Sequence, residues 1–269
     1  MKQKTKIKSI AIGTFDGLHI AHHALIAEAD ALVIIERNGG LLTAGYRRCF
    51  YTSKPCFFYH FDKIRALSPE DFVQKLKDDF SDLERIVVGY DFHFGKNKAG
   101  NAELLERLCD KEVMVIDEVC HEGVSVHSRT IRELLGNGEL KRAGELLGRD
   151  YLVAGDVISG QGLGAKSLVA TLNLDVKYYQ LPLAGVYATH TKIAGQWKDS
   201  ISFLGHRVTT DGAFAVETHI LGQDLGKVKG KVEIKFVDFI RQNHKFEGLN
   251  ALKLQIKKDI LEAQKILLS

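Results

Sequence analysis

The pattern of apolar residues changes near Gly148, and this change constrains the fold more than any other feature of the sequence. Before it, short apolar runs typical of strands alternate with segments that have the apolar spacing of helices. After it, strand-like segments follow one another with glycine-rich breaks between them. A length of 269 residues also suits two domains of roughly 100–200 residues each. We therefore expect one domain over residues 1–148 and a second over residues 149–269.

The alternation in the first part predicts an α/β domain. Residues 7–13 and 31–35 have the pattern of buried strands, and the spacing between them indicates a helix over residues 19–30. Further helices are expected over residues 68–80, 101–109, 128–135 and 139–147, and further strands over residues 84–89 and 112–116. Two strands joined through a helix usually lie parallel with a right-handed crossover, so we expect a parallel sheet.

The second part predicts a small barrel of antiparallel strands. Six strand candidates follow one another over residues 151–158, 168–174, 185–193, 198–204, 213–221 and 228–237. A terminal helix is expected because apolar residues recur every three or four positions, at Leu249, Leu252, Ile256, Ile260, Ala263 and Leu267. Short strands without helices between them are typical of antiparallel barrels.

Neither charge nor hydropathy marks the chain as a nucleic-acid or membrane protein. Thirty-seven basic residues against 34 acidic ones leave a net charge of +3. The longest apolar runs fall far short of the roughly eighteen residues that span a bilayer, and the N terminus lacks a signal-peptide pattern. The four cysteines, Cys49, Cys56, Cys109 and Cys120, form no C-x-x-C pair, so we interpret them as reduced thiols. We expect a cytoplasmic protein with no nucleic-acid or membrane partner; its oligomeric state stays open.

The segment from residue 13 to residue 22 lies where the first strand ends and the first helix begins. Free backbone N–H groups and the positive end of the helix dipole meet at such a point, which favours phosphate binding. Gly13 and Gly17 allow close approach of the backbone to a ligand, and His19 and His22 share one face of the first helical turn. The alternative is that the two histidines are ordinary residues of an amphipathic helix and have no role in binding.

This segment resembles the motif G-x-F-D-G-x-H-x-G-H of the flavin-nucleotide adenylyltransferases, within the H-x-G-H nucleotidyltransferase superfamily. The resemblance implies a Rossmann-like nucleotidyltransferase domain. It also implies catalytic roles for His19 and His22 and nucleotide contacts for Gly13, Phe15, Asp16 and Gly17.

Two later segments carry the same resemblance. Residues 88–101 resemble G-x-D-F-x-F-G-x-x-x-x-G, which implies flavin contacts for Asp91, Phe92 and Phe94 and phosphate contacts for Lys96 and Lys98; alone, the segment could be a solvated loop. Residues 128–132 resemble S-S-S/T-x-I-R, which implies a nucleotide contact for Ser128 and a catalytic clamp on the ATP phosphates for Arg132. An arginine on a surface helix is otherwise usually solvated.

In the barrel, Thr171 and Asn173 would point to one face of a strand and offer the hard oxygen ligands that Mg²⁺ prefers. The segment resembles the riboflavin kinase motif G-F-P-T-A-N, which implies that both residues hold the metal. The turn before it, with Gly160 and Gly164, is weak evidence for nucleotide binding.

Alternation in residues 214–220 places Phe214, Val216 and Ile220 on one side of a strand and Glu217 on the other, where the acid could simply face water. The segment resembles V-E-x-H-I-L, which implies that Glu217 is the general base for the ribityl hydroxyl. A C-terminal signature further implies that Arg241 reaches the FMN phosphate, although an ordinary surface arginine is equally compatible.

These motifs extend from Ile10 to Ile260 in the order of the bacterial bifunctional riboflavin kinase/FMN adenylyltransferases. The resemblance implies riboflavin, FMN and ATP as substrates, FAD as product and Mg²⁺ as cofactor. The chain departs from the family at Ala21, in a missing Pro-His-Pro loop after Ile35, at His127 and Arg129, and in the kinase at Leu168, Ala170, Phe203 and Val208. Two alternatives therefore stay open: that only one activity is retained, or that the protein binds flavin without catalysis.

Overall fold

The computed structural model describes residues 6–39, 41–159, 169–206, 214–223 and 226–268. The chain divides into two compact units, Met1–Ser128 and Arg129–Ser269, and each is described by itself. None of the helices in the described parts is long and apolar enough to cross a bilayer.

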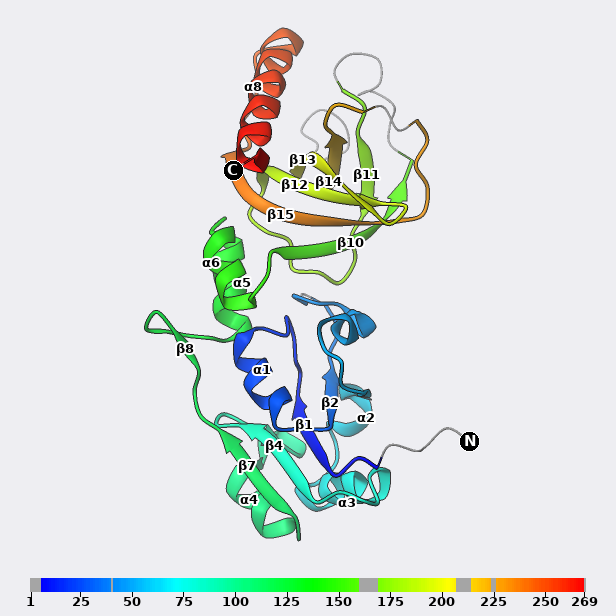
Figure 1. The fold of residues 1–269 in the computed structure, drawn as a ribbon, viewed down its shortest axis with the longest axis vertical. Coiled ribbons are helices and arrows are strands. Elements are labelled where there is room, and N and C mark those ends of the chain that lie inside the picture. Colours follow the sequence, from blue (N-terminus) through cyan, green and yellow to red (C-terminus); the bar gives the residue numbers. More distant parts are fainter. Residues whose placement is uncertain (1–5, 40, 160–168, 207–213, 224–225, 269) are drawn as a thin grey trace. The chain divides into compact units, whose positions relative to one another are not determined.

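The first unit contains a five-stranded parallel sheet, which confirms the predicted α/β fold (Figure 1). Its order is β3-β2-β1-β4-β7, with β1 at Ser9–Gly13, β2 at Ala31–Glu36, β3 at Cys56–His60, β4 at Arg85–Gly89 and β7 at Glu112–Ile116. The chain moves from β1 to β2 and β3 on one side and returns to β4 on the other. The strand order therefore reverses between β1 and β4, the point where ligands bind in sheets of this kind.

Helices cover both faces of this sheet, as alternate strand residues require. The helices are α1 (Ile20–Ala27), α2 (Phe61–Ile64), α3 (Pro69–Asp79) and α4 (Ala102–Leu108). Ile10, Ile12 and Val88 pack toward α3 and α4, whereas Ala11 and Val87 pack toward α1. Because successive side chains of a strand point to opposite faces, strands covered on both sides are apolar throughout.

Some elements of the first unit escaped the sequence prediction. They are β3, α2, the 3₁₀ segments η1 (Gly45–Tyr51) and η2 (Lys96–Lys98), and two short hairpins, β5 (His93–Phe94) with β6 (Gly100–Asn101) and β8 (Cys120–His121) with β9 (Val124–Ser125). The helix expected over residues 68–80 does begin as predicted, since the Ser68 hydroxyl accepts the N–H of Asp71 at 3.1 Å.

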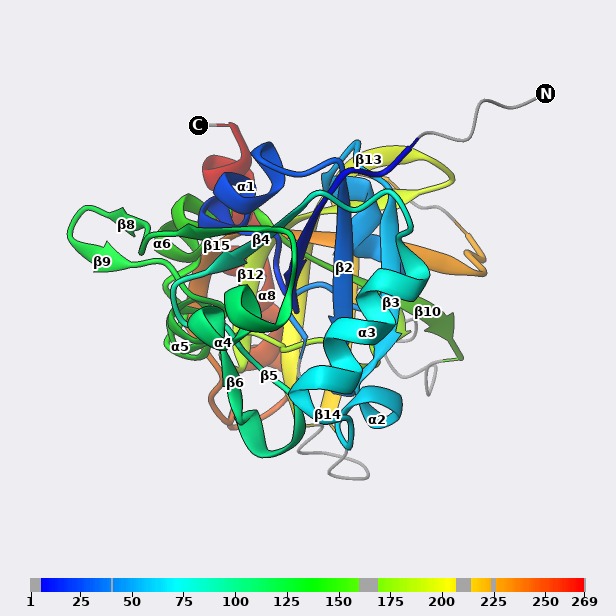
Figure 2. The same cartoon turned by 90° about the horizontal axis from the view of Figure 1, so that it is seen from below.

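The second unit is a closed antiparallel barrel, which confirms the predicted six-stranded architecture (Figure 1; Figure 2 labels β10, β12, β13, β14 and β15 in a second view). The order around it is β10-β11-β14-β13-β12-β15, with β10 at Tyr151–Ile158, β11 at Leu172–Asp175, β12 at Gly185–Ile193, β13 at Gln196–His206, β14 at Phe214–Ile220 and β15 at Lys231–Gln242. Closure leaves no free sheet edge among the described strands.

Three helices accompany the barrel. Helix α5 (Ser128–Gly136) leads to α6 (Leu140–Leu147), which packs against β10 and β15, and Gly148 ends α6 in the left-handed conformation at φ 70°. The terminal helix α8 (Leu249–Leu268) was predicted and packs against β12, β13 and β15. The change of pattern seen at Gly148 is therefore the point where a helix ends and the first barrel strand begins.

Candidate functional sites

The loop after β1 has an unusual backbone. Phe15, Gly17 and Leu18 have positive φ angles of 47°, 88° and 37°. The side chains of Phe15 and Leu18 are fully buried in the core between the sheet and α1. Two strained non-glycine residues are thus held by packing, and strain of this kind concentrates at ligand sites. Phe15 can approach a nucleotide through its backbone, because its ring is occupied by the core.

His19 and His22 lie together at the start of α1. His19 is the N-terminal cap residue, and its ring stacks on that of His22 with centroids 3.6 Å apart. Burial, and to a smaller extent the adjacent His19, hold the pKa of His22 well below its usual value. Its Nδ1 is enclosed and has no hydrogen-bond partner among the described residues. His22 is therefore a neutral ring with unused hydrogen-bonding capacity, which is what a site awaiting a polar ligand requires.

Asp16 and Ser128 hold the loop in place. The Asp16 carboxylate, 2% exposed, accepts the N–H of Thr43 at 3.0 Å, and the Asp16 carbonyl accepts the Ser128 hydroxyl at 2.7 Å. The structure thus brings together Asp16 and Ser128, which are 112 residues apart in the chain. Thr43 was not predicted, because nothing in the sequence links the segment after β2 to the first loop.

Arg48 is a second neighbour that the sequence did not predict. It is 1% exposed, its guanidinium pairs with Glu36, and its positive charge also lowers the pKa of His22. Glu36 lines a polar cavity of about 290 Å³ at the ends of β2 and β3, together with Arg37, Asn38, His60, Phe61 and Asp62. The only signal in the sequence was a pair of arginines among aromatic residues, in a segment without helical or strand periodicity.

The loop after β4 lies beside the loop after β1, because β1 and β4 are neighbours in the sheet. Asp91 is exposed and Phe92 half-buried. Phe94 is only 5% exposed and packs against Phe72, with ring centroids 5.4 Å apart. The ring of Phe94 therefore belongs to the core in this conformation, and the flavin contacts of all three residues stay predictions.

The structure gives less information about the remaining predicted site residues. Lys96 and Lys98 are exposed in η2 after the same loop. Arg132 is half-buried on α5, in the second unit. Gly160 and Gly164 lie outside the described residues. The roles assigned to these residues stay predictions.

In the barrel, Asn173 on β11 and Glu217 on β14 are directly opposite each other. Asn173 is buried, Glu217 is half-buried, and the neighbouring pair Leu174 and Val216 faces the interior. Since cross-strand partners share a face, the amide and the carboxylate project from the same outer side of the barrel. This pairing brings together two predicted site residues from distant parts of the chain.

Thr171 lies just before β11 rather than within it. The expected strand over residues 168–174 begins at Leu172, because the carbonyl of Ala170 meets Nδ1 of His219 at 2.8 Å rather than a strand partner. The half-buried hydroxyl of Thr171 is two residues from Asn173, but its orientation does not follow from strand alternation. Oxygen donors from a hydroxyl and an amide, near a carboxylate, are chemically suited to Mg²⁺.

Arg241 is engaged by the terminal helix. Its Nε and Nη2 donate to the Asp259 carboxylate at 2.9 and 2.7 Å, and Asp259 is 4% exposed. The Gln255 amide also donates to this carboxylate, at 2.7 Å. A bidentate pair of this kind orients the guanidinium firmly. Arg241 would have to reach an FMN phosphate with its remaining Nη1, which donates to the Gln242 carbonyl at 3.0 Å.

Comparison with known proteins gives two family matches: FAD synthetase over residues 53–130 and riboflavin kinase over residues 147–267. The chain is 27% identical to a bifunctional riboflavin kinase/FMN adenylyltransferase of Listeria monocytogenes, over 94% of this chain and 90% of that protein. A protein of the same name from Pseudomonas fluorescens is 26% identical, over 94% and 91%. The crystal structure of a protein named for macrolide efflux, from Streptococcus pneumoniae, shares the fold, with a TM-score of 0.83 and 23% identity over 97% of this chain and 95% of that one.

Proposed function

The chain belongs to the family of bifunctional riboflavin kinase/FMN adenylyltransferases, and we propose that it makes FAD in two steps. The second unit transfers the γ-phosphoryl group of ATP to riboflavin and releases ADP. The first unit then joins FMN to the adenylyl group of a second ATP and releases pyrophosphate. The observation that carries the proposal is that the FAD synthetase match, over residues 53–130, falls in the unit with the parallel sheet, and the riboflavin kinase match, over residues 147–267, covers the closed barrel. The contacts of Asp16 with Ser128 and of Asn173 with Glu217 support it.

For the kinase step, we assign Glu217 as the general base. Its carboxylate accepts the proton of the ribityl 5′-hydroxyl while the hydroxyl oxygen forms a bond to the γ-phosphorus and the bond to ADP breaks. Asn173, directly opposite on β11, supports this assignment because it places a neutral oxygen donor beside the base.

A magnesium ion fits the donor set of Thr171 and Asn173, which would hold it with hydroxyl and amide oxygens. When bound, it would supply charge neutralisation on the ATP phosphates. The residues of the chain supply the remainder of the chemistry: they orient the hydroxyl and accept its proton.

For the adenylyl step, no nucleophile from the protein is needed. A phosphate oxygen of FMN attacks the α-phosphorus of ATP, and the bond to pyrophosphate breaks. His19 and His22 donate hydrogen bonds to the charge that develops on the phosphates, Arg132 is assigned as a clamp on them, and the strained backbone of the β1 loop offers its amides.

The domain limits 1–148 and 149–269, and a cytoplasmic location, stay proposals drawn from the sequence. The hydrogen bond from the Ser128 hydroxyl to the Asp16 carbonyl lies within the first unit, Met1–Ser128, and supports a role for Ser128 in the site of that unit. The partners of the protein are the small molecules of the two reactions.

A single assay tests the proposal and its alternatives. The purified protein is incubated with ATP, Mg²⁺ and either riboflavin or FMN, and the flavins are separated by chromatography. We expect FMN and FAD from riboflavin, and FAD from FMN. FAD formed only from FMN would indicate a degenerate kinase, FMN without FAD would indicate a degenerate adenylyltransferase, and bound flavin without ATP consumption would indicate a binding protein.

A further inference from the structure

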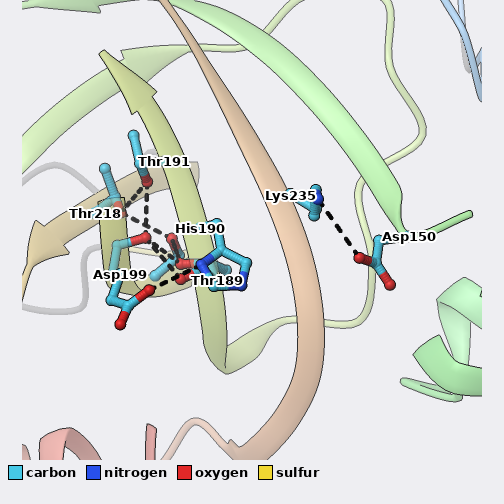
Figure 3. A network of polar contacts seen from close by, with 9 residues as sticks. Asp150, Thr189, His190, Thr191, Asp199, Thr218 and Lys235 are labelled. Atoms are coloured by element: carbon cyan, nitrogen blue, oxygen red, sulfur yellow. Dashed lines mark hydrogen bonds and ion pairs between the residues drawn. The ribbon is translucent and has the colours of Figure 1, made fainter. Parts of the chain in front are cut away.

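Five hydroxyl side chains form a closed ring of hydrogen bonds inside the barrel (Figure 3). They belong to Thr189 and Thr191 on β12, Ser200 and Ser202 on β13, and Thr218 on β14, and each residue has an exposed fraction of 0%. Buried hydroxyls are costly unless they are hydrogen-bonded, so their mutual contacts decide whether this arrangement is stable.

Every hydroxyl in the ring can donate its proton. Thr189 donates to Ser202 at 2.9 Å, Ser202 to Thr218 at 2.9 Å, Thr218 to Thr191 at 3.2 Å, Thr191 to Ser200 at 2.8 Å and Ser200 back to the Thr189 hydroxyl at 2.8 Å. This is one assignment of the hydrogens, and it leaves no donor of the five unused. The ring is therefore a fully satisfied polar network, and such networks favour one arrangement of the core over others.

The hydrogen bonds of the ring can form only when β14 pairs with β13 in the observed register. Ser202 is directly opposite Thr218, and the next pair along the two strands is Phe203 and Glu217. A shift of β14 by two residues would leave its backbone bonds available, but it would set Thr218 against Leu204 in one direction, or Ser202 against Val216 in the other. Either shift breaks the ring and leaves buried hydroxyls without partners.

A shift of β14 would also move Glu217 away from Asn173. The two residues face each other only in the observed register, in which Thr218 faces Leu172 across the same strand pair. Glu217 lies on the outer side of β14, and Thr218, its neighbour in the chain, lies on the inner side. The hydroxyl of Thr218 thus acts on the outer site through the backbone, without touching it.

We propose that Thr218 is a positioning residue for phosphoryl transfer, which fixes the register of β14 through its ring hydrogen bond to Ser202 on β13 and so holds Glu217 opposite Asn173. The inference rests on the proposed role of Glu217 as the base. It predicts that the ring affects the rate of proton transfer more than the binding of riboflavin or ATP.

The test compares Thr218→Val, which removes the hydroxyl at nearly constant volume, with Thr218→Ser, which keeps it. We expect Thr218→Val to lower kcat for FMN formation by roughly 10- to 100-fold, because β14 then adopts shifted registers in most molecules. A two-residue shift moves Glu217 by about 7 Å away from Asn173, and loss of a general base costs about 10²–10⁴. KM for riboflavin and ATP should change less than about twofold, as expected for an interaction used in the transition state. Thr218→Ser should restore most of kcat, and FAD formation from FMN should be unchanged in both.

Thr191→Val is the matched control, because it removes a hydroxyl from the same ring but leaves the bond between Ser202 and Thr218. It should lower thermal stability about as much as Thr218→Val and change kcat by less than about twofold. If Thr218→Val does not fold, Ser202→Ala removes the same bond from β13 and should give the same loss of kcat. Equal kcat losses in Thr191→Val and Thr218→Val, or an unchanged kcat in both Thr218→Val and Ser202→Ala, would overturn the inference. A wild-type protein that forms no FMN would instead overturn the proposed function of the barrel.

Discussion

The parallel sheet and the barrel position their candidate site residues in different ways. In the sheet, these residues lie on loops beyond the strands, held by a strained backbone, a helix start and long-range hydrogen bonds to Asp16. In the barrel, Asn173 and Glu217 lie within strands, and their relation depends on register. A site built on loops can adapt its backbone to a ligand, whereas a site built on strands keeps two side chains, here the proposed base and the proposed metal ligand, at a fixed separation.

The strongest test of this contrast is Glu217→Gln. We expect FMN formation to fall by roughly 10²–10⁴-fold, because a general base is lost, while FAD formation from FMN is retained. Flavin chromatography with riboflavin or FMN as substrate measures both steps. Glu233→Gln on β15 is the control, since it removes the same charge from another barrel strand and should leave both rates within about twofold. Loss of both activities in Glu217→Gln would refute separate sites.

His22→Ala is the corresponding change in the sheet. FAD formation from FMN should fall by about 10²–10³-fold, the range for removal of one donor to a developing charge, and FMN formation should be unchanged. His23→Ala, an exposed neighbour on the same helix, should keep most of the activity. The same flavin assay distinguishes the variants, and an undiminished FAD yield in His22→Ala would contradict the assigned role.

The two units should also respond differently to acid. The pKa of His22 is lowered in the folded protein, so the unfolded state, with a pKa near 6.5, binds the proton more readily. The contribution of His22 to stability is present above about pH 6.5 and is lost as the pH falls below it. Hydrogen exchange should therefore show weaker protection of the β1 and α1 amides at about pH 5.5 than at about pH 7.5. This difference in protection should be smaller in His22→Gln.

The barrel provides the control for that measurement. Trp197, the single tryptophan of the chain, lies on β13, so its fluorescence reports unfolding of the barrel alone. His22→Gln should leave the pH dependence of that signal unchanged. A pH dependence of sheet protection that is identical in wild type and His22→Gln would exclude His22 as its origin.

The smallest effect concerns the four cysteines, which all lie in the first unit. Burial, followed by a hydrogen bond with Cys49, raises the pKa of Cys56 to about 12, so its thiol stays protonated. At about pH 8, iodoacetamide should modify exposed Cys120 first and Cys56 much later, as mass spectrometry of peptides would reveal. FMN formation should survive complete alkylation. Early modification of Cys56, or rapid loss of FMN formation, would contradict this prediction.

The sequence was informative wherever periodicity and side-chain chemistry agreed. Alternation along β14 correctly placed Val216 and Ile220 inside the barrel, with Glu217 on the other side. The same rule could not predict that Ser200 and Ser202 face the interior, because polar residues on a strand are normally expected outside. Their burial is possible only because hydroxyls from three strands satisfy one another, and that requires knowledge of the pairing.

Other features depend on contacts between distant segments. Arg48 lies in a 3₁₀ segment without periodicity, and its burial becomes understandable only through its pair with Glu36. The motif predicts a flavin contact for Phe94, which stays a prediction, but it could not show that the ring of Phe94 packs against Phe72 in the core. A motif identifies the loop on which a residue lies but does not determine which way its side chain turns.

The pair of Arg241 and Asp259 has a consequence for how this protein could have arisen. It joins the last barrel strand to the last helix through an arginine that is 19% exposed and an aspartate that is 4% exposed, and removal of the arginine would leave a buried carboxylate without its cation. The barrel and its helix would therefore have to be inherited together, since a barrel without the helix would leave Arg241 without its carboxylate partner. The riboflavin kinase match, which extends over residues 147–267, includes both partners. The barrel and its terminal helix thus form one packed unit, and a gene fusion to a nucleotidyltransferase would leave its ion pair intact.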